Sequence, residues 1–399
     1  MTSYETKIPR FTVIIPTRNR PVYFRDALYS AARQTFGDLE IIVSDNSDPE
    51  FAAQNQMAVS ALGDRRVSYI TPPHILPMVD HWEWAFQQAH GDFVGVLTDR
   101  MALRLNALER INSVLLETKA EVVCYLSENI KEFPGYKASR VQRKHGHQLI
   151  SSDKKINEYS HALLTKDTPR VLNSFSSKNL LERLRGDVGH VFDSVSPDYY
   201  LMFRILKEID AYAAIKEPLL LVQGEHLSNG RANATGKNNK ASSDFWKSIP
   251  AHRQEYMKLG PIPDDITVMP NIILREYEVV ARMPTGKQFP KVSTEEFYKQ
   301  ASHYARTLAK AGELADSTRV TLDVFAERHS LAKQKVPDNK RRPVKAFLDK
   351  IWTAPVLGPG LCLVRIVVER VLAVSGISSR ISAKDLPALL DHDARAAKT

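Results

Sequence analysis

The chain has 399 residues, of which 43% are hydrophobic and 25% are charged, as in an ordinary globular protein. This length allows one large α/β domain and an appendage. The formal charge of +9 and the pI near 9.3 favour an anionic partner, such as a nucleotide diphosphate, a nucleic acid or an anionic membrane surface.

The cysteines and the apolar segments narrow the class further. Cys124 and Cys362 give neither a metal spacing nor a disulfide framework, so both are predicted to be buried reduced thiols. The first ten residues hold no apolar region, and no uninterrupted apolar run approaches the length of a membrane span. We therefore expect a cytoplasmic protein.

A βαβ unit is predicted between Phe11 and Asp48. Residues 12–15 and 40–43 are short apolar, β-branched runs, which suit strands that are buried on both faces of a parallel sheet. The intervening pattern is helical, with Asn19 as the expected N-cap and Pro21 in the first turn.

Both predicted strands of this unit end in polar loops, residues 16–19 and 44–47. Ligands of open α/β sheets bind at the carboxyl edge, where these loops lie together. The unit contains neither GxGxxG nor GxxxxGK[ST], which disfavours a dinucleotide-binding fold and a P-loop. A carboxylate at the end of the second strand, Asp45, suits hydrogen bonding to a base or a ribose.

The motifs VIIPTRNR and VSDNSD resemble the opening strand and the nucleotide-contacting second strand of inverting family 2 glycosyltransferases with the GT-A fold. The resemblance implies a Rossmann-like, mostly parallel sheet flanked by helices. It also implies a nucleotide-sugar donor and a hydroxyl acceptor on a glycan or a lipid-linked glycan. By the same resemblance, Pro16, Thr17, Arg18 and Asp45 contact the nucleotide.

The next elements continue the α/β alternation. Residues 66–70 are predicted to form a strand, Val79–His90 a helix with Trp82 in its core face, and residues 92–97 a strand whose carboxyl end carries residues 98–100, including Asp99. The run LPMVDHWEWAFQQAHGDFVGVLTDR strengthens the resemblance, because family members follow such a helix with a strand that ends in an acidic cluster.

In the resembled family this acidic cluster binds Mg2+ or Mn2+, and the metal holds the diphosphate of the donor. Asp99 matches the first position of the cluster, as a nucleotide and metal ligand, but Arg100 and Met101 stand where carboxylates are usual. Three interpretations remain open. Arg100 pairs with the diphosphate in place of a metal, or Asp99 alone holds a hydrated metal, or the catalytic centre has decayed and the domain only binds its ligand. Asp99 capping the next loop is the structural alternative.

The following segments carry weaker patterns. Leu105–Thr118 is predicted to be an amphipathic helix and Glu121–Leu126 a strand, after which the pattern fades between residues 131 and 167. His145 and His147 alternate, but no acidic or cysteine partner is near them in the sequence, so we assign them to a solvated loop. Leu172–Arg185 is predicted to be helical.

The segment SPDYYLMFRIL holds the candidate catalytic base. Ser196 is the expected N-cap and Pro197 the first residue of a helix, so Asp198 lies in a first turn where the dipole favours its ionised form. Such a carboxylate can accept the proton of an acceptor hydroxyl, although an Asp in a first turn needs no function.

The resemblance, which covers roughly residues 8–235, implies that Asp198 is the base, because the family carries it on an Asp before an aromatic-rich helix. His226 lies where some GT-A enzymes supply a late metal or phosphate ligand. The structural alternative is a loop histidine without a ligand role.

Three regions are predicted: a GT-A-like domain over residues 1–235, a helical appendage over 236–332, and a basic linker with an amphipathic segment over 333–399. The appendage begins with a polar loop, residues 236–250, and contains helices at Ile272–Arg282 and Thr294–Gly312. Residues 333–375 combine basic and interrupted apolar stretches, which suit either peripheral binding to an anionic membrane or packing on protein.

The resemblance therefore implies a glycosyltransferase, of the hexosyltransferase type and active in polysaccharide biosynthesis, that works by inverting single displacement. The alternative is a catalytically silent protein that binds a nucleotide sugar or a glycan. Nucleic-acid binding is disfavoured, because basic and aromatic residues are not interleaved on strands and no known module is present.

Overall fold

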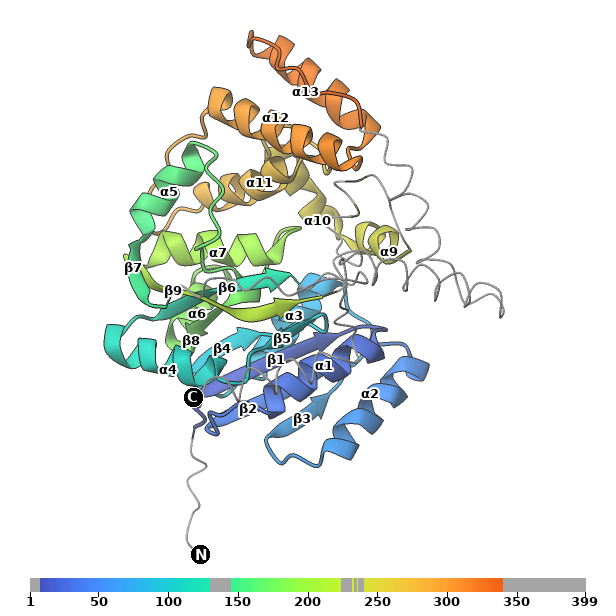
Figure 1. Cartoon of the computed structure of the whole chain (residues 1–399), viewed down its shortest axis with the longest axis vertical. Helices are drawn as coiled ribbons and strands as arrows, with labels where there is room; N and C mark the ends of the chain where they lie inside the picture. Colours follow the sequence, from blue (N-terminus) through green and yellow to red (C-terminus); the bar gives the residue numbers. More distant parts are fainter. Residues whose placement is uncertain (1–7, 130–144, 224–231, 233–234, 236–239, 340–399) are drawn as a thin grey trace, which may run out of the picture.

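A computed structural model describes residues 8–129, 145–223, 232, 235 and 240–339 (Figure 1). The strands are β1 (Phe11–Thr17), β2 (Leu39–Asp45), β3 (Val67–Ile70), β4 (Phe93–Val96), β5 (Met101–Leu103), β6 (Val122–Asn129), β7 (His147–Ser151), β8 (Ser174–Ser177) and β9 (Ala211–Val222). The helices before β9 are α1 (Pro21–Ala32), α2 (Pro49–Leu62), α3 (Met78–Gln87), α4 (Ala107–Thr118), α5 (Ser152–Ser160), the 3-10 turn η1 (Val171–Asn173), α6 (Lys178–Val188) and α7 (Pro197–Glu208). Those after it are α9 (Lys240–Ser248), α10 (Ala251–Gln254), η3 (Glu255–Leu259), α11 (Met269–Ala281), α12 (Thr294–Ala311) and α13 (Asp316–Arg328).

The strands of the described chain form one mixed sheet in the order β3-β2-β1-β4-β8-β6-β9-β5, with β7 also paired to β9. β3, β2, β1 and β4 are mutually parallel, as the βαβ pattern predicts. The sheet is less parallel than expected beyond β4, because β8 runs antiparallel between β4 and β6, and β5 and β7 run antiparallel to β9. The predicted α/β class, with a sheet flanked by helices, is confirmed.

The two faces of the sheet belong to two separate hydrophobic cores. All seven residues of β1 are buried, and they alternate between the faces. Val13 and Ile15 point into a core that also contains Leu28 of α1 and Ile111 of α4. Ile14 belongs to the second core, which is built with α3, α6 and α7. The continuous apolar run in this strand is therefore explained, as predicted, by the burial of both faces of the sheet.

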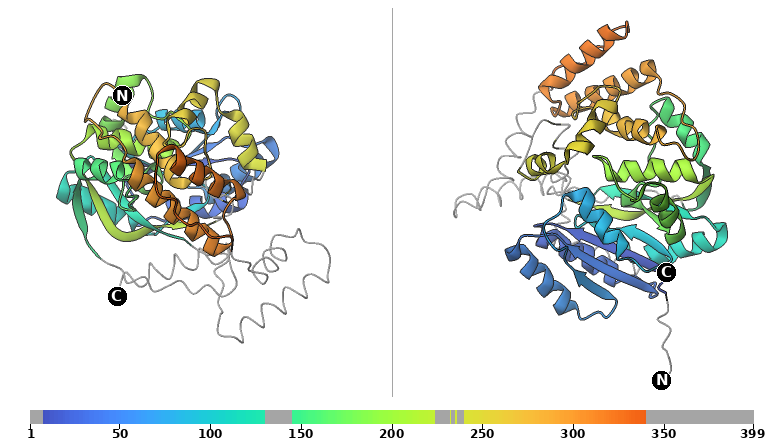
Figure 2. Two further views of the ribbon diagram at one scale, coloured as in Figure 1. Left: turned by 90° about the horizontal axis from the view of Figure 1, so that it is seen from above. Right: turned by 180° about the vertical axis from the view of Figure 1, so that it is seen from behind.

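The second core continues beyond the sheet into the C-terminal helices. Figure 1 shows α7 between the sheet and α11, with α12 and α13 stacked further out, and Figure 2 shows the same order from behind. Leu206, Tyr277 and Phe297, from α7, α11 and α12, belong to the same core. The predicted helices at 272–282 and 294–312 are confirmed as α11 and α12.

Two predicted segments are wrong. Leu172–Arg185 is not one helix, because residues 174–177 form β8, which pairs with both β4 and β6, and the helix α6 starts only at Lys178. Residues 236–250 are not all loop, because α9 covers Lys240–Ser248. In β8, pairing on both sides outweighs the weak local preference of Ser-Phe-Ser-Ser.

The histidine segment also differs from the prediction. His147 begins β7, which pairs with β9, whereas His145 remains exposed as expected. The side chain of His147 lies 3.3 Å from Glu117 of α4, so it belongs to the edge of the sheet instead of a solvated loop. Cys124 is buried, as predicted.

The membrane prediction for residues 333–375 lies mostly outside the described residues, which end at residue 339. Cys362 lies outside them as well. Within the described part of the chain, none of the helices has the length and apolar character required to cross a membrane.

Candidate functional site

Thr17, Asp45 and Asp99 lie together at the carboxyl edge of the parallel strands. Thr17 ends β1 and pairs in register with Asp45, which ends β2. Asp99 follows β4, and the Leu97 N–H donates to the Ile14 carbonyl, which extends the pairing of β1 and β4. The Thr17 hydroxyl donates to Asp99 Oδ2 at 3.3 Å, so three residues that the sequence singles out form one site.

The Asp45 carboxylate is 2% exposed and is held by three donors. Oδ1 accepts the Ser47 N–H at 2.9 Å, and Oδ2 accepts the Asn55 amide at 2.9 Å and the Tyr69 hydroxyl at 2.8 Å. Burial and the Asp45 charge raise the pKa of the Tyr69 hydroxyl, so it stays a donor at neutral pH. The carboxylate therefore has one defined orientation. Asn55 and Tyr69 were not identified from the sequence.

The two edge loops are tied to each other. The Asn19 N–H donates to the Ser47 hydroxyl at 2.8 Å, and the Asn19 amide exchanges two hydrogen bonds with Asp48, at 2.8 and 2.9 Å. Asn19 was expected to be the N-cap of α1, but the N-cap is Arg20, and its side chain makes no capping bond. Asn19 adopts φ +57°, a left-handed conformation that Asn tolerates, and joins the loops instead. Pro16 is buried and Arg18 is exposed.

His81 of α3 is a site residue that the sequence did not single out. Its Nε2 lies 2.7 Å from the hydroxyl of Ser44, the residue directly before Asp45 in β2. Burial lowers the pKa of His81 to about 4. The negative charge of Asp45 opposes this shift, and the positive charge of Arg18 adds to it. The imidazole is therefore neutral at pH 7. Its neighbour Trp82 packs in the core against Phe192, as predicted.

Asp99 is 4% exposed, and this chain's own donors surround it. Arg20 Nη1 lies 3.4 Å from Oδ1, and the Thr17 hydroxyl reaches Oδ2. Burial raises the pKa of Asp99, whereas Arg20 and then Arg100 act in the opposite direction. Arg100 Nη1 donates to the Gln223 carbonyl at 3.2 Å, and the Gln223 N–H donates back to the Arg100 carbonyl at 2.9 Å.

A divalent metal does not fit the donors at this position. Each Asp99 oxygen already accepts a hydrogen bond, and the neighbouring cations Arg20 and Arg100 repel a metal ion. Among the described residues, no group of three or more His, Cys, Asp and Glu side chains could hold an ion. His226, the other residue named as a metal ligand, lies outside the described part.

Asp198 lies in the first turn of α7, as predicted, and is half-buried. Burial raises the pKa of its carboxyl, and the Arg170 guanidinium opposes this shift. Arg170 also donates to the Tyr199 hydroxyl at 3.3 Å and lies 5.6 Å from the centre of that ring. Ser196 is the N-cap residue but makes no capping bond, and its hydroxyl instead accepts from Arg275 of α11 at 3.1 Å.

Arg170 connects Asp198 to the same edge as Asp99. β8 pairs antiparallel to β4 with Gly95 opposite Phe175, so the start of β8 lies where β4 ends. Arg170 directly precedes η1, which leads into β8. Arg170, whose charge acts on Asp198, therefore lies near the strand end that Asp99 follows.

The loop that leads into α7 is held by a carboxylate of α3. Glu83 Oε2 accepts the N–H groups of Val191 and Phe192 at 2.8 and 2.9 Å, and Oε1 lies 3.2 Å from the Arg185 guanidinium. Asp193 of the same loop pairs with Arg253 of α10 at 2.7 Å. These long-range contacts position the start of α7, and no local sequence pattern indicates them.

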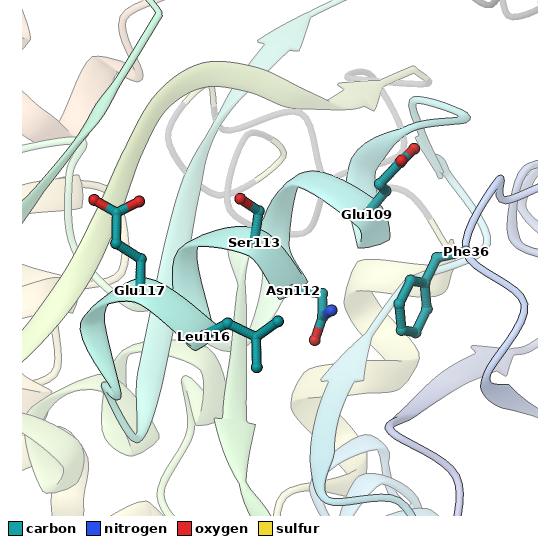
Figure 3. Close-up of a pocket in the computed structure, with 6 residues that line it drawn as sticks. All are labelled: Phe36, Glu109, Asn112, Ser113, Leu116 and Glu117. Atoms are coloured by element: carbon teal, nitrogen blue, oxygen red, sulfur yellow. The ribbon is translucent and has the colours of Figure 1, made fainter.

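A surface hollow of about 640 Å³ lies away from this site. Figure 3 shows its lining, which consists of five α4 residues and Phe36: Glu109, Asn112, Ser113, Leu116, Glu117 and Phe36. Phe36 precedes β2, so the hollow lies toward the amino edge of the sheet. It contains none of the predicted site residues.

A comparison with protein families matches the part of the chain that contains this sheet edge. Residues 12–168 match the family "Glycosyl transferase family 2", so the chain contains a domain of that family. This confirms the resemblance. The matched residues include Thr17, Asp45 and Asp99, but Asp198 lies beyond them.

The chain also resembles individual proteins. It is 30% identical over 133 residues to the GalNAc(5)-diNAcBac-PP-undecaprenol beta-1,3-glucosyltransferase of Campylobacter jejuni, a match that covers 32% of this chain and 43% of that protein. It therefore spans less than half the length of this curated relative. S. aureus TarS residues 1–349, in complex with UDP-GlcNAc, have a TM-score of 0.46 and 14% identity over 83% of this chain and 95% of that chain. The mannosyltransferase PcManGT of Pyrobaculum calidifontis, in complex with GDP-Man and Mn2+, has a TM-score of 0.41 and 16% identity over 82% and 89% of the two chains.

Proposed function

We propose that this protein transfers a sugar from a nucleotide-sugar donor to a hydroxyl acceptor by inverting single displacement. The observation that carries the proposal is the meeting of Thr17, Asp45 and Asp99 at one sheet edge, inside the segment that matches glycosyl transferase family 2. Ligands of such sheets bind at the carboxyl ends of the strands.

In this proposal the donor lies along the edge. Asp45, oriented by its three donors, accepts a hydrogen bond from the base or the ribose, and Pro16, Thr17 and Arg18 line the same strand end. Arg100 contacts the diphosphate. The chemistry requires positive charge there, because the leaving diphosphate gains negative charge as the glycosidic bond breaks.

Asp198 acts as the general base. It accepts the proton of the acceptor hydroxyl while that oxygen attacks the anomeric carbon and the nucleoside diphosphate leaves from the opposite face. Its raised pKa suits this role, because a stronger base accepts a proton more readily. The adjacent Arg170 cation stabilises the ionised form of the carboxyl, which is the form that accepts a proton.

The relative in Campylobacter supports a proposal for the acceptor class, because its name describes a glucosyltransferase for an undecaprenol-linked glycan. We propose a hexose as the transferred sugar and a lipid-linked glycan as the acceptor. Such an acceptor lies at a membrane surface, and the basic residues between 333 and 345 suit an anionic one.

A second candidate is a silent protein that binds nucleotide sugars without turnover. The engagement of Asp99 by Arg20 and Thr17 favours this candidate, because the carboxylate is not open to a metal.

A panel of UDP-, GDP- and dTDP-sugars in a thermal-shift assay tests donor binding, because a ligand that binds the native state raises its melting temperature. We expect one nucleotide class to raise it and Asp45→Ala to abolish the increase. A panel in which no nucleotide sugar raises it contradicts both candidates.

A further inference from the structure

The Asp99 carboxylate, where the family resemblance implies a metal, is occupied by cations and donors of this chain. We propose that the diphosphate of the donor is held by an arginine cluster, Arg18, Arg20 and Arg100, without a divalent metal, and that Asp99 orients Arg20. This inference rests on the proposed function, since it concerns the same donor. Arg20 is a binding residue that sequence reasoning did not identify.

The first argument is the geometry of the carboxylate. Arg20 Nη1 lies 3.4 Å from Asp99 Oδ1, and the Thr17 hydroxyl lies 3.3 Å from Oδ2. A Mg2+ ion binds carboxylate oxygens at about 2.0 to 2.1 Å and requires near-octahedral geometry. At a residue that is only 4% exposed, the ion would have to displace the guanidinium or the hydroxyl.

The second argument is the charge of the edge. Three guanidinium groups, of Arg18, Arg20 and Arg100, stand on the loops after β1 and β4. Asp45 is already stabilised by neutral donors, and Asp48 accepts from the Asn19 amide. At Asp99 the charges of both Arg20 and Arg100 act on a single carboxylate, so the local charge is positive before any ligand binds. A divalent cation is repelled, whereas a diphosphate is attracted.

The third argument is the chemistry of the guanidinium. It stays protonated at any physiological pH and presents paired N–H donors in a plane, which matches two phosphate oxygens. A guanidinium can therefore stabilise the charge of the leaving group as a metal does. Arg20 is held on one arm by Asp99, and Arg100 is held by the Gln223 carbonyl, so both side chains are positioned before the ligand arrives.

The role of Asp99 changes accordingly. It lies 79 positions from Arg20 in the sequence, and the parallel pairing of β1 with β4 brings the two together. As a positioning residue, it acts on the diphosphate only through Arg20. Asp99→Asn should therefore weaken binding equally with and without metal.

Isothermal titration calorimetry of the full chain with UDP and GDP, in EDTA and in MnCl2, tests the inference. We expect one of the two nucleotides to bind with nearly the same affinity in both buffers. Arg20→Ala should lower this affinity roughly tenfold to a hundredfold, as expected for a charge-assisted contact. Arg20→Lys, which keeps the charge but loses the paired donors, should recover only part of the loss.

Arg25→Ala is the matched control for Arg20→Ala. Arg25 lies on α1, which begins directly after Arg20, its side chain is exposed, and its removal changes the net charge equally. Its affinity should equal that of the wild type. Melting temperatures of the variants identify any loss that is due to unfolding.

Two results would overturn the inference and are distinguishable from each other. If UDP or GDP binds only with Mn2+, and Arg20→Ala binds as well as the wild type, the arginine cluster is wrong while the proposed function stands. If neither nucleotide binds in either buffer and no nucleotide sugar raises the melting temperature, the proposed function fails together with the inference.

Discussion

At the scale of single residues, Asp198 makes the sharpest prediction. Asp198→Asn should lower turnover by about two to four orders of magnitude, because a general base contributes that much, and should leave donor affinity nearly unchanged. Steady-state kinetics and nucleotide titration measure the two quantities.

Asp153→Asn provides the matched control for Asp198. Asp153 also lies in the first turn of a helix, α5, but its side chain is 75% exposed and distant from the edge in the fold. Turnover should stay at the wild-type level. Full activity of the Asp198 variant would remove Asp198 from the mechanism, and an equal loss of activity and melting temperature would make it a structural residue.

His81 makes a prediction about pH. Its pKa in the folded state is about 4, below the ordinary histidine value of 6.5, so the unfolded chain binds a proton between these values and the folded chain does not. Folding stability must then decrease as the pH falls from about 6.5 toward 4. Between pH 7.5 and pH 5 this single group should cost about 2 kcal/mol.

Urea unfolding of the wild type and of His81→Gln at the two pH values measures this cost. The variant should lose about 2 kcal/mol less than the wild type on acidification, because it lacks the titrating imidazole. Identical losses in the two proteins would show that His81 is not held neutral by burial.

At the scale of elements, the sequence predicts what local patterns encode. The βαβ unit over residues 11–48 was predictable because buried parallel strands and an amphipathic helix have distinct periods. β8 was not, because Ser-Phe-Ser-Ser has no strong preference and becomes a strand through two neighbours that are distant in the sequence. The contact of Arg20 with Asp99 was hidden for the same reason, since it depends on strand pairing.

The packing of α11 on α7 gives a prediction for stability. Arg275 and Glu276 of α11 are 1% and 0% exposed and lie 3.1 Å apart, and Arg275 also reaches the hydroxyl of Ser196. Arg275→Ala leaves the Glu276 carboxylate buried without its cation, which should cost about 3 to 5 kcal/mol of unfolding free energy.

Chemical denaturation of Arg275→Ala measures this loss. Arg282→Ala, which removes an exposed arginine at the end of the same helix, should change stability by less than about 0.5 kcal/mol. A loss below about 1 kcal/mol in the Arg275 variant would mean that the buried Glu276 carboxylate does not depend on the Arg275 cation.

At the scale of the whole molecule, the described C-terminal helices share a hydrophobic core with the sheet. This core continues through Tyr277 of α11 to Phe325 of α13, across the boundary near residue 235 that the sequence predicts between the first domain and its helical appendage. Composition alone could not show this, because it indicates amphipathic helices without identifying the surface that they cover.

The basic C-terminal region gives a further prediction at this scale. A chain that ends at residue 339 keeps the hydrogen bond between Asn339 and Leu314, so it should melt like the full-length protein. The full-length chain should co-sediment with anionic vesicles in a salt-sensitive way, and the shorter chain should not. Equal sedimentation of the two chains would place the vesicle-binding region elsewhere in the protein.

The central claim is sugar transfer at the edge formed by Thr17, Asp45 and Asp99. The most direct test measures release of the nucleoside diphosphate from a UDP- or GDP-sugar, with and without a polyprenol-diphosphate-linked glycan. We predict acceptor-dependent release in the wild type, a sugar product of inverted anomeric configuration, and no release by Asp45→Ala. A protein that binds a nucleotide sugar but never releases the diphosphate, with any glycan acceptor, would contradict the claim and identify a silent binding domain.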